Sequence, residues 1–239
     1  MNIVLLDDPD WIDDQCVQLR GRRQQHLIQV LGVSVGSTVK VGQLGGLRGS
    51  GTVISTSTDS IQLRVTLDQP PSPRHPFTLV LGLPRPKMLR RVLRTCAEFG
   101  VADVHLIHSR RVEKSFWQSP LLTPAKIREA LQAGLERSGD TVLPQVTLHH
   151  RFRPFVEDQL QTLADGRSIY IAHPGDYPQL GHDSQGEAVV MIGPEGGFIP
   201  FEIDRLHHAF MDMLILCLVR PDRKRILIEK FFLAHFAER

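Results

Sequence analysis

A glycine-rich segment containing one acid, Ile192-Gly193-Pro194-Glu195-Gly196-Gly197, has the composition of a ligand-binding loop. It directly follows Ala188 to Ile192, an apolar run typical of a strand buried on both faces of a parallel sheet. Glycine lets a ligand approach the backbone closely, and ligands of open α/β sheets bind beyond the carboxyl ends of the strands. We therefore expect a ligand site that comprises Ile192, Gly193, Pro194, Glu195, Gly196 and Gly197. The alternative is an ordinary connecting turn, because the segment matches neither the GxGxxG fingerprint nor a P-loop.

A second loop of this kind follows Ser168 to Ala172, the preceding apolar run. It opens with His173 and Pro174, and a lone histidine at a turn is more often structural than functional. Because the carboxyl ends of parallel strands meet at one edge of a sheet, the two loops together predict a shared crevice. We therefore include His173 and Pro174 in the same candidate site.

Basic residues gather in three stretches, although the net charge is only +2. Residues 74–97 contain no acid, and shorter basic stretches lie at residues 20–23 and 110–111. Such stripes can neutralise phosphates; the alternative is a solvated helix face. The predicted RNA contacts are Arg22, Arg23, Lys87, Arg90, Arg91, Arg94, Arg110 and Arg111. Aromatic residues make up only 6% of the chain, so no base-stacking platform is evident.

The remaining composition argues against several classes of protein. The N-terminus lacks the basic and long apolar regions of a signal peptide, and no apolar run approaches the roughly 20 residues that span a bilayer. The three cysteines lie far apart, without CxxC or a nearby histidine pair, which argues against a disulfide framework and a metal site. No Ser-His-Asp or Cys-His grouping at diagnostic spacing is present. We expect a cytoplasmic protein with no metal and no membrane partner.

Residues 1 to about 68 predict a small β domain. Val39 to Gly42 and Gly51 to Ser55 flank a glycine-rich hairpin turn, and Ser60 to Leu67 alternates as a third strand. One helix is expected from Gln24 to Leu31. Four prolines at residues 70–76 favour an extended connector, because proline cannot donate to a strand ladder. The sequence thus predicts a small β domain at 1–70, a linker at 71–76 and a second domain at 77–239.

Strands and helices alternate from residue 77 onward, which predicts an α/β domain with a parallel sheet. Strands are expected at residues 77–83, 104–107, 168–172 and 188–192. One helix is expected at residues 87–99, where Gly100 ends it. Another is expected from Pro124 to Ser138, with Thr123 as its N-cap.

Taken in order along nearly the whole chain, these residues resemble the 16S ribosomal RNA uridine-N3-methyltransferase family of the SPOUT superfamily. Ile192 to Phe198, with Glu202-Ile203 behind it, looks like the most specific motif of that family. Lys87-Met88 and Glu98 to Val101 are similar to the two ends of a family helix. Weaker similarities lie at His26 to Leu31, Ser109-Arg110, Glu136 to Gly139 with Pro144, and His173-Pro174.

The resemblance implies a PUA-like N-terminal β-barrel and a C-terminal α/β domain with a parallel sheet and a deep trefoil knot, in a homodimer. It implies S-adenosylmethionine as cofactor, held by the two strand-end loops and by Leu218, Ile226 and Leu227. The implied reaction is methyl transfer to N3 of a uridine in 16S ribosomal RNA, either free or in the assembled small ribosomal subunit. Because N3 must lose a proton, a base or a cation is needed, and Arg225 is the candidate cation.

The tail departs from the family pattern. The last knot loop of the family reads Leu-Gly-x-Arg-Ile-Leu-Arg-x-Glu-Thr-Ala, whereas here Arg225-Ile226-Leu227 resembles a displaced remnant without the flanking Leu-Gly and Thr-Ala. The tail is either an amphipathic helix or the product of a frame change near Leu216. Two alternative functions therefore stay open. They are ribose 2′-O-methylation by a related knotted enzyme, and RNA binding by a non-catalytic relative with an incomplete cofactor pocket.

Overall fold

The computed structural model describes residues 1–173, 187–210 and 213–217. The chain divides into two compact units: residues 1–73 with 131–143 form the first, and residues 74–130 with 144–239 form the second. The sequence predicts a boundary at residues 71–76 and does not anticipate that residues 131–143 belong to the first unit. In the part of the chain that is described, no helix is long and apolar enough to cross a membrane.

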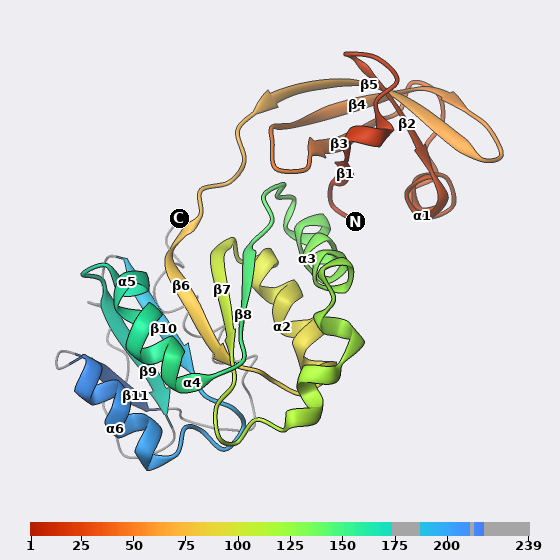
Figure 1. The fold of residues 1–239 in the computed structure, drawn as a ribbon. Coiled ribbons are helices and arrows are strands. Elements are labelled where there is room, and N and C mark those ends of the chain that lie inside the picture. The colour runs from red at the N-terminus through yellow and green to blue at the C-terminus, as the bar shows by residue number, and fades with distance from the viewer. Residues whose placement is uncertain (174–186, 211–212, 218–239) are drawn as a thin grey trace. The chain divides into compact units, whose positions relative to one another are not determined.

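The first unit is a curled five-stranded sheet with strand order β1-β3-β4-β5-β2 (Figure 1). β1 and β3 are parallel, and the other neighbouring strands are antiparallel. The strands are β1 (Val4–Leu6), β2 (Cys16–Arg20), β3 (Thr38–Gln43), β4 (Arg48–Thr56) and β5 (Ser60–Gln69). The helical segments are η1 (Asp8–Asp10), α1 (Gly21–Gln25) and the π-helical η2 (His26–Val30).

Alternation along the strands builds the core of this unit. Ile61, Leu63 and Val65 of β5 are buried while the residues between them face outward, as the period-2 pattern predicts. The predicted hairpin is confirmed, because β3 and β4 pair around a turn in which Gly45 has a φ of +78°. The predicted helix is confirmed in position but begins earlier, at Gly21. β1 and β2 were not predicted from the sequence.

Residues 131–143 join the first unit through hydrogen bonds. The Glu136 carbonyl accepts the Asn2 N–H at 2.6 Å. Thr141 bonds twice to the β3–β4 turn: its carbonyl accepts from the Gly45 N–H at 2.8 Å, and its hydroxyl donates to the Gly46 carbonyl at 2.6 Å. The second half of α3 (Pro124–Ser138) and the segment after it therefore pack as part of the β unit.

The second unit is built on an all-parallel six-stranded sheet with order β11-β9-β10-β6-β7-β8. Its strands are β6 (His75–Gly82), β7 (Val101–Ile107), β8 (Gln145–His149), β9 (Ser168–His173), β10 (Ala188–Ile192) and β11 (Leu214–Cys217). Its helical segments, besides the first half of α3, are α2 (Pro86–Glu98), η3 (Lys114–Gln118), η4 (Pro120–Leu122), α4 (Phe152–Pro154), η5 (Phe155–Gln159), α5 (Leu160–Ala164) and α6 (Pro200–Ala209).

The predicted parallel sheet is confirmed, and the predicted strands at 168–172 and 188–192 are β9 and β10. α2 ends before Gly100, which has a φ of +67° as expected of a helix stop. The hydroxyl of Thr123, the predicted cap of α3, donates to the Pro120 carbonyl at 2.9 Å. β6 begins at His75, inside the predicted linker, and β8 and the α4–α5 region were not identified from the sequence.

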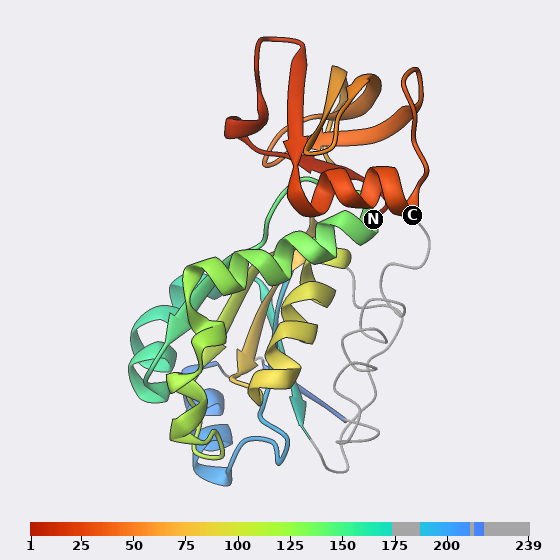
Figure 2. The same ribbon diagram turned by 90° about the vertical axis from the view of Figure 1, so that its right-hand side faces the viewer.

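Helices cover both faces of this sheet (Figures 1 and 2). Alternate strand residues, among them Ile169, Ile171 and Met191, pack with the α4–α5 region and α6. α2 lies on the opposite face, where Leu89, Val92 and Leu93 are buried. Because both faces are covered, the strands carry near-continuous apolar runs, and only the strand ends are left to bind a ligand.

Candidate functional site

The carboxyl ends of three neighbouring strands lie side by side at one edge of the sheet. In the sheet, Ile192 of β10 pairs with Ala172 of β9, and His173 of β9 pairs with Cys217 of β11. His173 and the start of the segment that follows β10 therefore lie at the same edge of the sheet. Burial, assisted by the nearby Arg111 guanidinium, lowers the pKa of His173, so this ring is neutral at pH 7.

The glycine loop after β10 (residues 193–198) folds back tightly on itself. The Gly197 N–H donates to the Pro194 carbonyl at 2.7 Å, and Gly197 has a φ of +73°, a conformation that favours glycine. A Cβ on Gly193 would lie 3.0 Å from the Gly197 carbonyl carbon and 3.0 Å from the Phe198 nitrogen. Gly193 and Gly197 are therefore required by the turn itself, quite apart from any ligand.

The end of β6 also touches this loop. A Cβ on Gly82, the last residue of β6, would lie 2.8 Å from Pro194 Cδ, so this glycine makes room for the proline. Arg85, which follows β6, forms an ion pair of 3.1 Å with Glu195. Both of those side chains are largely exposed, so the pair contributes little to stability.

A buried carboxylate links the glycine loop to the loop after β7 (residues 108–112). Glu202 of α6 is only 3% exposed, and each of its oxygens accepts a backbone N–H. Oε1 accepts from Arg110 at 2.7 Å, and Oε2 accepts from Ile199 at 3.0 Å. Ile199 is the N-cap residue of α6, a position where a polar side chain is usual. Because Ile199 has no polar side chain, the Glu202 carboxylate provides the hydrogen-bond acceptor at the start of this helix.

Arg111 makes a second link between these two loops. Its guanidinium Nη1 donates to the Gly196 carbonyl and lies 3.5 Å from the Phe198 carbonyl. A Cβ on Gly196 would lie 3.0 Å from Arg111 Cδ. The glycine loop is thus held from outside by one carboxylate and one guanidinium, and neither group requires a ligand to be in place.

The structure places the predicted site residues unevenly. Ile192, Gly193, Pro194 and Gly197 are buried at the sheet edge, whereas Glu195 and Gly196 are exposed and face Arg85 and Arg111. Glu195 therefore lies on the outer side of the loop, where it pairs with Arg85. The predicted residues Pro174, Leu218, Arg225, Ile226 and Leu227 lie outside the described residues.

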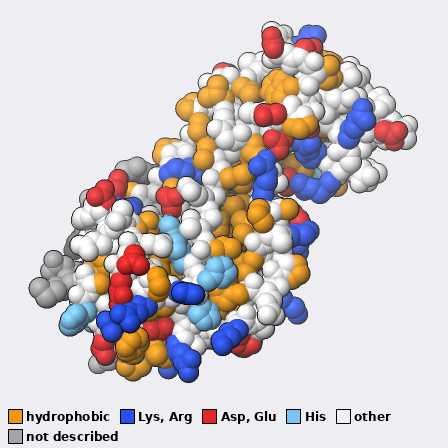
Figure 3. All heavy atoms as spheres, viewed as in Figure 1, with side chains coloured by type: hydrophobic (Ala, Val, Ile, Leu, Met, Phe, Trp, Pro, Cys, Tyr) orange, Lys and Arg blue, Asp and Glu red, His pale blue; other side chains and the backbone are white. Residues whose placement is uncertain are grey.

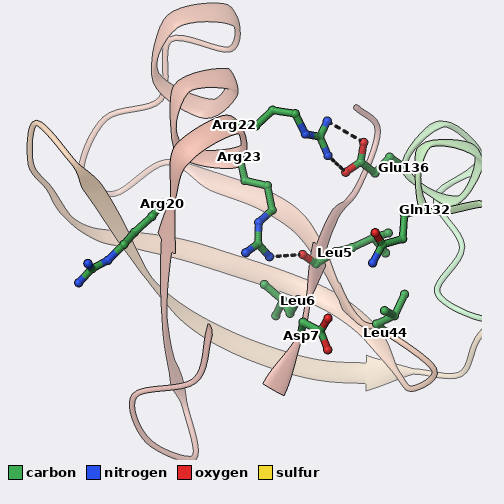
Figure 4. Close-up of a pocket in the computed structure, with 9 residues that line it drawn as sticks. All are labelled: Leu5, Leu6, Asp7, Arg20, Arg22, Arg23, Leu44, Gln132 and Glu136. Carbon is green, nitrogen blue, oxygen red and sulfur yellow. Dashed lines mark hydrogen bonds and ion pairs between the residues drawn. The ribbon is translucent and has the colours of Figure 1, made fainter. Parts of the chain in front are cut away.

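The predicted RNA contacts in the first unit are both engaged in ion pairs. Arg23 forks onto Asp10 with N–O distances of 2.5 and 2.6 Å and donates to the Leu5 carbonyl. Arg22 is exposed but forms a two-pronged ion pair with the nearly buried Glu136 (Figure 4). A hollow of about 290 Å³ lies beside them. Its lining residues are Leu5, Leu6, Asp7, Arg20, Arg22, Arg23, Leu44, Gln132 and Glu136.

The cations predicted in the second unit are more accessible. Lys87, Arg90 and Arg91 of α2 are exposed. Arg90 forms a long ion pair with Glu129, with 3.4 Å between Nη2 and Oε1. Arg94 is half-buried and pairs with Glu98 one turn further along α2. Arg110 is exposed at its side chain, whereas Arg111 is bound to the glycine loop.

Two features of this region escaped the sequence analysis. The linking role of Glu202 was missed because its partner Arg110 lies far away in the chain, although the motif itself includes Glu202. A cluster of aromatic rings around Trp117 was also missed.

Within residues 1–173, 187–210 and 213–217, no group of three or more His, Cys, Asp or Glu side chains could hold a metal ion.

The fold and the site define a class of protein. A parallel sheet covered on both faces, with a tight glycine loop at its carboxyl edge, is the arrangement of an α/β protein that binds a small molecule beyond its strand ends.

Comparison with known proteins narrows this class. Residues 70–218 match the RNA methyltransferase domain family. The chain is 33% identical over 209 residues to ribosomal RNA small subunit methyltransferase E of Treponema pallidum (strain Nichols), which covers 84% of this chain and 78% of that protein. Ribosomal RNA small subunit methyltransferase E from Neisseria gonorrhoeae, solved bound to S-adenosyl methionine, has the same fold, with a TM-score of 0.73, 19% identity and 98% of each chain covered. The chain belongs to the RNA methyltransferase family.

Proposed function

We propose that this protein transfers the methyl group of S-adenosylmethionine to N3 of a uridine in 16S ribosomal RNA. The observation that carries the proposal is the 33% identity to ribosomal RNA small subunit methyltransferase E across 84% of the chain. The glycine loop at the sheet edge supports the proposal independently. Hydrogen bonds within the protein keep it in a tight turn, which is a conformation suited to binding a ligand.

The residues at the sheet edge fit S-adenosylmethionine by their chemistry. The glycine loop offers backbone without side chains for the polar groups of the cofactor, and the apolar residues Ile192 and Phe198 are buried at its two ends. Both oxygens of Glu202 are occupied by N–H groups, so this acid does not confront a ligand. We assign the cofactor to His173, Ile192 and the glycine loop. Pro174, Leu218, Ile226 and Leu227 remain proposed contacts on the strength of the resemblance alone.

The bound cofactor supplies a methyl group that is activated by attachment to a sulfonium. In the transfer, the sulfur–methyl bond breaks, the N3–methyl bond forms and the N3 proton leaves to solvent or a base. The chain contributes positioning, which can supply much of the rate of a two-reactant transfer. Glu202 and Arg111 fix the segment that would hold the cofactor, and the neutral ring of His173 would add no positive charge to a site for a cationic ligand. Arg225 stays the proposed cation that favours the N3 anion.

We further propose that the substrate is 16S ribosomal RNA, free or in the small ribosomal subunit, and that the enzyme works as a cytoplasmic homodimer. The curled sheet of the first unit supports a PUA-like docking barrel at residues 1–70, joined by residues 71–76 to a methyltransferase domain at residues 77–239. β11 pairs with β9 rather than with β10. The connection from β10 to β11 therefore passes β9 and places β11 on its far side. A trefoil knot is built on such a crossing.

A non-catalytic relative is the competing proposal, and one observation favours it. The family match ends at residue 218, next to the point near Leu216 where the tail departs from the family pattern. A tail that no longer closes the pocket would leave RNA binding intact and weaken the binding of cofactor.

Methyl transfer from radiolabelled S-adenosylmethionine to naked 16S RNA and to assembled small subunits tests the proposal. Nucleoside analysis of the digested product should identify 3-methyluridine, and calorimetry should show cofactor binding by the protein alone. A labelled 2′-O-methylnucleoside would overturn the assignment to N3. RNA binding without cofactor binding would instead support the non-catalytic relative.

A further inference from the structure

Three aromatic rings meet where β7 and β8 end at the carboxyl edge of the sheet. Trp117, in η3, lies 4.2 Å from His150 and 6.0 Å from His108 between ring centroids. His108 follows β7 and His150 follows β8, so three separate segments contribute one ring each. This cluster is not evident from the sequence, because only the fold brings the three rings together.

A hydrogen bond fixes the indole within the cluster. Trp117 Nε1 donates to His108 Nδ1 at 2.7 Å, which requires that this imidazole nitrogen carry no proton. Burial lowers the pKa of His108, the positive Lys114 and the neighbouring His150 lower it further, and Glu202 opposes the shift. The ring is therefore neutral at pH 7, which keeps the acceptor and the orientation of Trp117.

Exposed cations lie close to the ring residues along the chain, and the charge of Lys114 acts on His108. Arg110, Lys114 and Arg151 are exposed, and none of them forms an ion pair with a described residue. The acid nearest to Arg110 and Lys114 in the chain is the exposed Glu113. The acid nearest to Arg151 in the chain is Glu157, which already pairs with Arg153 and Arg205. Histidine and cationic side chains lie together on the face of the second unit that Figure 3 shows.

We propose that Trp117, with His108 and His150, forms a platform on which an unpaired base of the RNA substrate stacks, while Arg110, Lys114 and Arg151 bind the adjoining phosphates. Aromatic faces bind any base, and cations beside them track the backbone, which is the arrangement of proteins that hold single-stranded nucleic acid. We favour RNA over a protein partner because the exposed residues next to the rings in the chain include Arg110, Lys114 and Arg151. This inference rests on the proposed function and names the part of the chain that holds its RNA.

The loop after β7 connects this platform to the glycine loop. Arg110 offers its side chain to RNA while Glu202 holds its backbone, and the next residue, Arg111, is bound to Gly196. A base on the platform is therefore held by the same loop that supports the cofactor site within this unit. That position suits a nucleotide next to the one that is methylated.

Fluorescence gives a direct test, because the chain has two tryptophans. Trp11 lies in the first unit, where its ring donates one hydrogen bond to Gln43 at 2.8 Å, so Trp11→Phe leaves Trp117 as the only indole. A short oligouridylate should quench Trp117 in this background, and an abasic oligomer of the same length should not. Quenching of equal size by both oligomers would overturn the stacking proposal.

Substitutions separate stacking from charge. Trp117→Leu should weaken binding of the oligouridylate by about fivefold or more, whereas Trp117→Phe should retain most of the affinity. Lys114→Ala should reduce the salt dependence of RNA binding. Lys126→Ala is the matched control, because Lys126 is an exposed lysine of α3 that pairs with Glu129.

Methyl transfer by the wild-type protein is measured in parallel. Its absence overturns the proposed function. Its presence, with RNA affinity unchanged in the folded Trp117→Leu variant, overturns only the platform.

Discussion

Glu202→Gln is the substitution that most directly tests how the cofactor loop is held. The carboxylate accepts one N–H on each oxygen, at 2.7 Å from Arg110 and at 3.0 Å from Ile199. Glutamine has almost the same shape, but only one of its two terminal groups can accept a hydrogen bond. Its amide NH₂ would face an N–H donor, so one link between the two loops is lost and a donor is left unsatisfied.

The structure allows a magnitude for this change. A hydrogen bond to a charged group contributes about 1.5–3 kcal/mol, and each 1.4 kcal/mol corresponds to about tenfold in an equilibrium constant. Because Glu202 is 3% exposed, water cannot replace the lost bond. We expect Glu202→Gln to weaken S-adenosylmethionine binding about tenfold and to lower the free energy of unfolding by about 1–3 kcal/mol.

Calorimetric titration with S-adenosylmethionine measures the affinity, and hydrogen exchange of the Arg110 and Ile199 amides reports the link itself. Both amides should exchange faster in the variant. Glu157→Gln is the matched control, since that exposed acid also contacts α6, through Arg205, but does not touch the glycine loop. A folded Glu202→Gln protein with unchanged exchange at both amides and unchanged affinity would refute the reasoning.

Three further predictions follow from single contacts. Gly197→Val should reduce cofactor affinity at least tenfold in calorimetry, because Gly197 has a φ of +73°, which a β-branched residue tolerates poorly. In Gly196→Ala the new Cβ meets only the flexible Arg111 side chain, so the cofactor affinity should stay within about threefold of the wild-type value. Arg91→Ala should lower the slope of log affinity against log salt for RNA by about 0.7–0.9, measured by titration at several salt concentrations, and an unchanged slope would remove Arg91 from the RNA surface. Burial, with smaller contributions from neighbouring charges, lowers the pKa of His105 to about 4 from 6.5. The unfolded chain therefore binds the proton more tightly, so the free energy of unfolding should fall as the pH drops from 6.5 towards 4. Urea midpoints should show this trend, and it should be smaller in His105→Asn.

The elements that the sequence predicted correctly are those whose local pattern leaves little choice. β9 and β10 are apolar runs, which suit the interior of a sheet covered on both faces. α2 carries its apolar residues on one face and ends at a glycine with positive φ. A tight turn after β10 was expected because three glycines follow an apolar strand, and its role as a ligand site stays a prediction.

The elements that were missed lack such a pattern. β1 has only three residues, too few to show a period, and its parallel pairing with β3 joins residues far apart in the chain. β8 is half-buried along most of its length, so its alternation is weak. The packing of residues 131–143 in the first unit depends on contacts such as Thr141 with Gly46, which no local signal reveals.

The charged residues show most clearly what a sequence leaves open. Arg23 and Arg91 both looked like phosphate contacts, yet Arg23 is forked onto Asp10 while Arg91 is exposed on α2. A guanidinium already bound to a carboxylate gains little from a phosphate, because the acid must first be released. The salt dependence of RNA binding should therefore depend more on Arg91 and on the cations around Trp117 than on Arg23. This conclusion needs the partner of each cation, and the partner is decided only when the chain folds.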